Sequence, residues 1–135
     1  MTLDAYQAVL GILRADPRVV AVYAFGSAAR GQPDARDVDV AVLLDRRLDW
    51  EAERELRAAV LAAEPRADLV VLNDAPPALR WEVLTGGHCL LGRDPRTQAE
   101  FEIVSLSRFL DFQPVRRVQA DYLRSRVAER RGSAG

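Results

Sequence analysis

Short apolar runs alternate along the chain with longer segments in which apolar residues recur every three or four positions. Short and mostly apolar runs are typical of buried strands, and they lie at 19–25, 38–44, 68–72 and 88–91. The three-to-four spacing predicts helices at 3–14, 50–64, 78–85, 97–112 and 115–130. The pattern therefore predicts an α+β fold, in which helices flank a small mixed β-sheet and two helices close the chain.

The connections between these strands predict how they pair. A short polar loop joins 19–25 to 38–44, which favours an antiparallel pair. A helix separates 38–44 from 68–72, and a strand–helix–strand unit normally returns parallel and right-handed. Asp49 directly precedes that helix and is expected to be its N-cap. The run at 88–91 is short, and we expect it at a sheet edge.

The length of 135 residues favours one domain, which we expect to span residues 1–131. Residues 132–135, Gly-Ser-Ala-Gly, are expected to form a disordered tail. The preceding helix carries several arginines, and we expect them either to meet a partner or to form a solvated basic face. They include Arg116, Arg117, Arg124 and Arg126.

The loop after the first strand begins with Gly26-Ser27, which has the properties of a phosphate-binding turn. Gly26 has no Cβ, so the backbone can turn sharply there and approach a phosphate closely. A short helix starting near Ser27 would present free N–H groups and a positive dipole end to an anion. Arg30 follows one turn later and could reach a phosphate, although an ion pair with Asp34 or Asp37 is equally compatible with the pattern.

Acidic residues stand at the start of two predicted strands. Asp37 and Asp39 are two positions apart, so their carboxylates leave the same face of the strand. Asp68 opens the next strand, and a parallel pairing would bring it beside them. Carboxylates opposite a phosphate turn suit Mg²⁺ held between protein and nucleotide phosphates. The alternative is a hairpin whose aspartates only cap turns.

Gly26-Ser27, nine residues, and then Asp37-x-Asp39 resembles the signature of the polymerase-beta-like nucleotidyltransferase superfamily. The small size and the segment from Asp68 to Asn73 look most like the minimal nucleotidyltransferases, which are commonly paired as antitoxins with HEPN-domain toxins. The resemblance covers about residues 19–112. It implies a nucleotidyltransferase fold and transfer of AMP from ATP to a hydroxyl.

The resemblance also implies roles for the matching residues. Gly26 and Ser27 would hold the terminal phosphates, while Asp37 and Asp39 would bind Mg²⁺, with two ions expected. Asp68 would be a further metal ligand and a candidate general base. The implied acceptor is a tyrosine of a cognate HEPN toxin, which makes the chain a protein adenylyltransferase and an antitoxin. Two alternatives stay open: a small-molecule nucleotidyltransferase of the aminoglycoside-modifying kind, and an antitoxin that acts by binding alone.

Composition narrows these functions further. All 19 basic residues are arginine, which excludes a lysine nucleophile or Schiff base. The formal net charge of −1 does not favour direct nucleic-acid binding. No apolar run reaches membrane-spanning length, no secretion signal is visible, and the single cysteine excludes an intrachain disulfide, so a cytoplasmic protein is expected. His88 is the only histidine, and its strand lies away from the aspartates, so we expect a packing or surface role.

Overall fold

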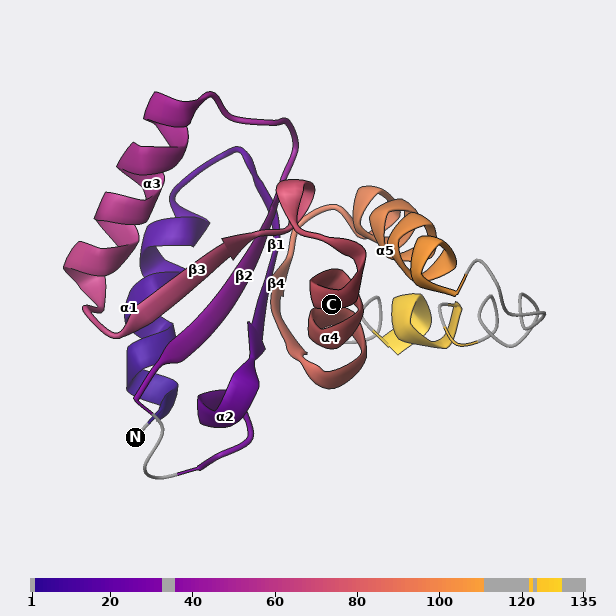
Figure 1. Ribbon diagram of the computed structural model, residues 1–135, viewed down its shortest axis with the longest axis horizontal. Coiled ribbons are helices and arrows are strands. Elements are labelled where there is room, and N and C mark those ends of the chain that lie inside the picture. The colour runs from indigo at the N-terminus through magenta and orange to yellow at the C-terminus, as the bar shows by residue number, and fades with distance from the viewer. Residues whose placement is uncertain (1, 33–35, 111–121, 123, 130–135) are drawn as a thin grey trace.

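The computed structural model describes residues 2–32, 36–110, 122 and 124–129. Figure 1 shows the helices and strands of this part of the chain. In chain order they are α1 (Thr2–Arg14), β1 (Val19–Phe25), α2 (Gly26–Ala29), β2 (Val38–Leu44), α3 (Trp50–Ala63), β3 (Ala67–Val71), the 3₁₀ turn η1 (Leu72–Asp74), α4 (Pro77–Gly86), β4 (His88–Gly92) and α5 (Pro95–Phe109). The α+β fold expected from the sequence is confirmed.

The four strands form one mixed sheet in the order β3-β2-β1-β4. β1 is antiparallel to both β2 and β4, and β2 is parallel to β3 across the α3 connection. The predicted bounds of β1 and β2 are confirmed, whereas β3 begins and ends one residue earlier than expected and β4 extends one residue further. The predicted pairing and the edge position of β4 are confirmed.

Helices cover both faces of the sheet, with α1 and α3 on one face and α4 and α5 on the other (Figure 1). Successive side chains of β2 alternate between these layers, as strand geometry requires. Val38, Val40 and Val42 belong to the core cluster beneath α1 and α3, while Ala41 and Leu43 belong to the cluster beneath α4 and α5. Even-numbered positions of β2 thus face α1 and α3, and odd-numbered positions, including Asp39, face α4 and α5.

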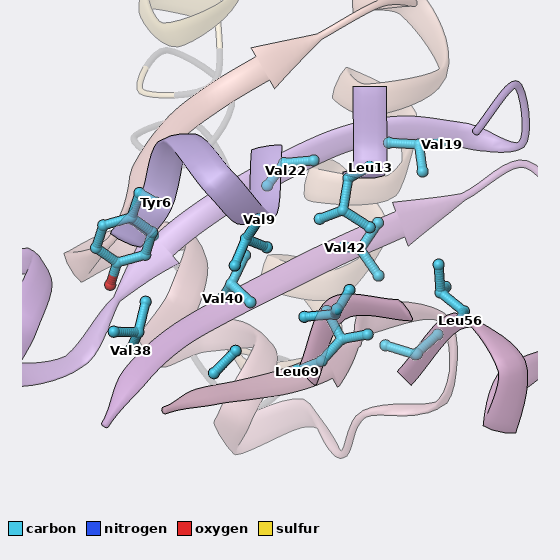
Figure 2. Close-up of a cluster of buried hydrophobic side chains, with 14 of the residues drawn as sticks. Tyr6, Val9, Leu13, Val19, Val22, Val38, Val40, Val42, Leu56 and Leu69 are labelled. Atoms are coloured by element: carbon cyan, nitrogen blue, oxygen red, sulfur yellow. The ribbon is translucent and has the colours of Figure 1, made fainter. Parts of the chain in front are cut away.

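The cluster beneath α1 and α3 runs the length of the sheet. Figure 2 shows that Tyr6, Val9 and Leu13 of α1 follow one another along β2. Val9 and Leu13 are fully buried, and Tyr6 is 6% exposed. α1 is therefore fixed to the sheet by one apolar stripe, and Tyr6 lies at the end of the stripe next to Val38.

Two helix starts show how local chemistry sets the boundaries. Asp49 accepts a hydrogen bond from the backbone N–H of Ala52 at 2.8 Å, which confirms the predicted N-cap of α3. α5 begins at Pro95, two residues before the predicted start, because Asp94 caps it and proline is tolerated in a first helical turn. The predicted start at residue 97 was wrong for this reason. α5 ends at Phe109, and residues 111–112 lie outside the described residues.

The predicted C-terminal helix falls mostly outside the described residues, as do Arg116, Arg117 and the tail at 132–135. Residues 122 and 124–129 are helical. Arg126 donates from Nη2 to the backbone oxygen of Leu84 at 2.9 Å, and its guanidinium lies 5.5 Å from the ring centroid of Tyr122. This hydrogen bond ties the segment to α4, and the expectation that the arginines of this helix meet a partner stays a prediction. In the described part of the chain, no helix has the length and apolar character that crossing a bilayer requires.

The side chain of Asn73 is bound to the backbone of β2 at the end of the sheet opposite the aspartates. Its side chain accepts from Leu44 N at 2.9 Å and donates to Leu44 O at 2.8 Å, so it extends the β2–β3 pairing beyond Val71. Asn73→Ala should lower the free energy of unfolding by about 2 kcal/mol, since two backbone groups lose their partner. Urea unfolding followed by circular dichroism measures this loss.

Asn73→Asp is the matched control, because it keeps the acceptor for Leu44 N but replaces the donor to Leu44 O with a carboxylate oxygen. It should be at least as destabilising as Asn73→Ala. Unfolding midpoints equal to that of the wild type for both variants would show that this bridge contributes nothing to stability.

Candidate active site

The predicted phosphate turn begins where β1 ends. Gly26 has a φ of +79°, a backbone conformation that residues with a side chain rarely adopt, and it opens the single-turn helix α2. A Cβ atom at Gly26 would overlap Asp39 Oδ2 and lie 2.9 Å from Asp39 Cγ. Position 26 thus requires glycine for two reasons: the positive φ of the turn, and the close approach of the Asp39 carboxylate.

The helix α2 is only one turn long, but its backbone carbonyls accept hydrogen bonds from backbone N–H groups of the following loop. The Ser27 carbonyl accepts from the backbone N–H of Arg30 at 3.2 Å and of Gln32 at 3.1 Å. These bonds hold the loop in a compact turn that keeps the backbone of Gly26 and Ser27 in place. The Ser27 side chain is half-buried at the start of this turn.

Strand register brings the second half of the site to the same place. Asp39 pairs with Phe25 on β1 and with Asp68 on β3, so the three residues form one row across the sheet. Directly opposed residues share a face, and Asp39 therefore lies beside Asp68 and against Gly26, which follows Phe25. Asp37 stands just before β2 and is exposed. The structure thus brings together Gly26, Asp39 and Asp68 as the sequence predicted, and the exposed Asp37 lies two positions before Asp39.

The electrostatics of this row show that its carboxylates act on one another. Burial raises the pKa of Asp39 above its ordinary value, and the negative charges of Asp68, Asp37 and Glu82 raise it further. Arg30 has the opposite effect and lowers the pKa of Asp39. A cation placed among these groups would relieve the repulsion, which is the electrostatic property expected of a metal site.

Glu82 is a residue that the sequence analysis missed. It is exposed on α4, one position before Val83, which is fully buried against the sheet. The apolar spacing of α4 says nothing about Glu82, because only the packing of α4 over the ends of β1 and β2 brings its charge near Asp39. No signal in the sequence separates it from an ordinary solvated glutamate.

The carboxylates fit Mg²⁺ shared with a nucleotide better than a metal held by protein alone. Among residues 2–32, 36–110 and the described C-terminal positions, no three acidic, histidine or cysteine side chains form a group able to hold a metal ion. Mg²⁺ usually keeps several waters and binds one or two carboxylates together with substrate phosphates. Asp37, Asp39 and Asp68 offer hard oxygen ligands, and the turn at Gly26 offers a place for phosphates, so the donor set suits that arrangement.

A second residue missed by the sequence analysis supports the site from the opposite face. Tyr6 of α1 donates from its hydroxyl to the backbone oxygen of Asp39 at 3.0 Å, and the same hydroxyl lies 3.4 Å from the backbone oxygen of Phe25. Burial raises the pKa of Tyr6 to about 12, and Asp39 adds to this rise, so the hydroxyl remains a donor at neutral pH. No role was assigned to Tyr6 from the sequence; the available signal was a hydroxyl among the apolar residues of the predicted helix at 3–14.

The two other candidate residues, Arg30 and His88, have different surroundings. Arg30 is exposed and forms no ion pair with any residue that the structure describes, although Asp34 lies outside those residues. His88 is exposed and pairs with Ala24, which belongs to the cluster beneath α1 and α3. The expected surface role of His88 is confirmed, whereas Arg30 stays available to an anion at the turn.

Comparisons with known proteins agree with this geometry. The family model "Polymerase beta, Nucleotidyltransferase" matches residues 7–96, a span that includes Gly26, Ser27, Asp37, Asp39 and Asp68. A search of curated proteins produced no match. Solved structures of 27–29% identity match nearly the whole chain.

The first of these structures is the complex of a tri-AMPylated Shewanella oneidensis HEPN toxin with its MNT antitoxin. The identity is 28% and the TM-score 0.66, over 91% of this chain and 98% of that chain. A toxin–antitoxin structure with AMP-PNP matches with 29% identity and a TM-score of 0.67, over 87% of this chain and 96% of that chain. A MntA–HepT toxin–antitoxin structure matches with 27% identity and a TM-score of 0.64, over 91% and 98%. The resemblance drawn from the motif residues is confirmed.

Gly26 and Gly31 form a matched pair for testing the close approach. Both have positive φ, but nothing lies within 4 Å of a Cβ at Gly31. Gly31→Ala should cost about 1–2 kcal/mol of stability, the ordinary penalty of a left-handed backbone. Gly26→Ala should cost clearly more, because its methyl group must also displace the Asp39 carboxylate. Urea unfolding of both variants checks the difference, and equal losses would contradict the close approach.

The raised pKa of Asp39 predicts a pH-dependent gain in stability from Asp39→Asn. An ionised carboxylate with a raised pKa destabilises the folded state at neutral pH, and this penalty disappears as the carboxyl is protonated. Asp39→Asn should therefore raise the free energy of unfolding at pH 7, and the gain should shrink as the pH falls towards about 4. Urea unfolding over a pH series measures both.

Asp94 provides a control of opposite sign, because hydrogen bonds from Thr97 lower its pKa. Asp94→Asn should lower stability at neutral pH, and this loss should fade as the pH is lowered. A gain from Asp39→Asn that does not change with pH would mean that charge is not its cause.

Proposed function

The chain belongs to the polymerase beta nucleotidyltransferase family, and we propose that it transfers AMP from ATP to a tyrosine hydroxyl of a cognate HEPN-domain toxin. In this role it is the antitoxin of the pair and a protein adenylyltransferase. The observation that carries the proposal is the row of Gly26, Asp39 and Asp68 across three strands, in a fold similar to that found in complex with a tri-AMPylated HEPN toxin.

Each residue of the site has a role in the proposed reaction. The backbone at Gly26 and Ser27 holds the terminal phosphates of ATP, and Arg30 adds a cation at the same turn. Asp37, Asp39 and Asp68 hold Mg²⁺, which when bound neutralises phosphate charge and orients the triphosphate. The acceptor oxygen forms a bond to the α-phosphorus while the bond from that phosphorus to the bridging oxygen breaks, and pyrophosphate leaves. Asp68 takes the proton of the acceptor hydroxyl.

Two arguments favour a protein acceptor. The site lies at one end of a small sheet, where Asp37 and Asp68 are exposed and a protein surface can reach them, and a similar chain is found in complex with a tri-AMPylated HEPN toxin. An adenylyl group also adds bulk and negative charge to the tyrosine that receives it. Modification near the toxin's active site therefore explains neutralisation without a permanent complex.

Coexpression with the toxin tests the proposal. The partner in this experiment is the cognate HEPN-domain toxin, and its intact mass is measured after purification from cells. Coexpression with the wild type should add the mass of one or more adenylyl groups to the toxin. Asp37→Ala, Asp39→Ala in one chain should abolish the added mass, because the proposed metal ligands are lost.

The matched control removes two negative charges elsewhere. Asp45→Ala, Glu51→Ala changes exposed residues after β2 and at the start of α3, remote from Gly26, and should leave the added mass unchanged. Neutralisation of the toxin by the Asp37→Ala, Asp39→Ala variant, with no added mass in either toxin sample, would show that contact alone is the mechanism.

A further inference from the structure

The two halves of the site are attached to different strands. Gly26 and Ser27 follow β1, while Asp39 belongs to β2. The last pair of the β1–β2 ladder is Phe25 opposite Asp39. Beyond this pair the chain turns away into α2, so no further ladder pair holds the turn against Asp39. Strand ends open more easily than strand centres, so the geometry of the site depends on what fixes this final pair.

Tyr6 contacts both members of that pair. Its hydroxyl donates to Asp39 O at 3.0 Å and lies 3.4 Å from Phe25 O. The contact comes from α1, which lies on the face of the sheet away from α4. The ring is only 6% exposed and belongs to the core cluster with Val9 and Val38, so packing holds the hydroxyl in one position (Figure 2).

The site has little room for movement between its halves. The Asp39 carboxylate occupies the space that a Cβ of Gly26 would fill. A small separation of β1 from β2 at this end would therefore change the position of Asp39 relative to the backbone of the turn. The hydrogen bond from Tyr6 to Asp39 acts on the same residue that carries this carboxylate.

We infer that Tyr6 is a positioning residue for nucleotide binding: its hydroxyl holds the ends of β1 and β2 together and so sets the position of Asp39 against the phosphate turn. The inference rests on the function proposed above for this site. Tyr6 lies on the face of the sheet covered by α1 and α3. Its hydroxyl contacts the backbone oxygens of Phe25 and Asp39, and through them it fixes the position of the Asp39 carboxylate. Loss of such a supporting contact typically weakens metal affinity or activity by about 10–100-fold.

The test compares single-oxygen deletions at two buried tyrosines. Tyr6→Phe removes the hydroxyl that bridges the strand ends. Tyr23→Phe is the matched control, since the Tyr23 hydroxyl is also buried but accepts from Gln98 Nε2 at 2.7 Å, within the cluster beneath α4 and α5. Val9→Ala is a second control, because it weakens the packing of α1 and keeps the Tyr6 hydroxyl.

The full chain is titrated with α,β-methylene ATP by isothermal calorimetry, with and without Mg²⁺. This analogue cannot be cleaved at the bond that AMP transfer breaks, so binding is measured without turnover. Urea unfolding without ligand, at the temperature of the calorimetry, checks that the wild type and the three variants are all folded. Tyr6→Phe should weaken Mg²⁺-dependent binding by about 10-fold or more, while Tyr23→Phe and Val9→Ala should bind like the wild type.

Binding by folded Tyr6→Phe as tight as that of the wild type would overturn the inference and leave the proposed function intact. An equal weakening in Tyr6→Phe and in the two controls would also overturn it, since general destabilisation would then be the cause. A wild-type protein that does not bind the analogue in the presence of Mg²⁺ would overturn the proposed function itself, and this inference with it.

Discussion

Phe25 and Asp39 face each other at the last position of the β1–β2 ladder, and the site is built outwards from this pair. On one side of it, β1 gives way to Gly26, whose missing side chain leaves room for the Asp39 carboxylate. On the other side, the parallel pairing of β2 with β3 puts Asp68 next to Asp39. Two kinds of strand pairing thus converge on one residue, and a shift of register in either would separate the carboxylates from the turn.

The same convergence makes the empty site electrostatically unfavourable. Asp39 is partly buried, and the charges of Asp68, Asp37 and Glu82 oppose its ionisation. A fold optimised for stability alone would not gather these groups, because burial of like charges has a cost. The arrangement is understandable if a cation and a polyphosphate bind there, since stability is commonly lost where function requires strained or repelling groups.

Helices on both faces of the sheet pack against the strand ends that carry the site. On one face, Gly87 after α4 lies against β1 so closely that a Cβ there would be 2.8 Å from the Ala24 carbonyl, which brings the end of α4 over the site. On the other face, the apolar stripe of α1 seats Tyr6 under the backbone of Phe25 and Asp39. Packing on both sides therefore fixes the strand ends, where ladder hydrogen bonds alone would leave them free to open.

Much of this protein follows from local sequence. The apolar runs at 19–25 and 38–44, the cap at Asp49 and the short first loop determined the strands, the α3 start and the antiparallel pair, because each depends on neighbouring residues only. The spacing of Gly26, Asp37 and Asp39 also identified the family, since the turn and the carboxylates lie on one strand–turn–strand unit. Tertiary structure alone decided that Glu82 lies near Asp39, that Tyr6 bonds to Asp39 and that Arg126 binds Leu84. Those contacts join segments 33 to 43 positions apart, and their geometry is set by how helices pack on the sheet, which no local pattern records.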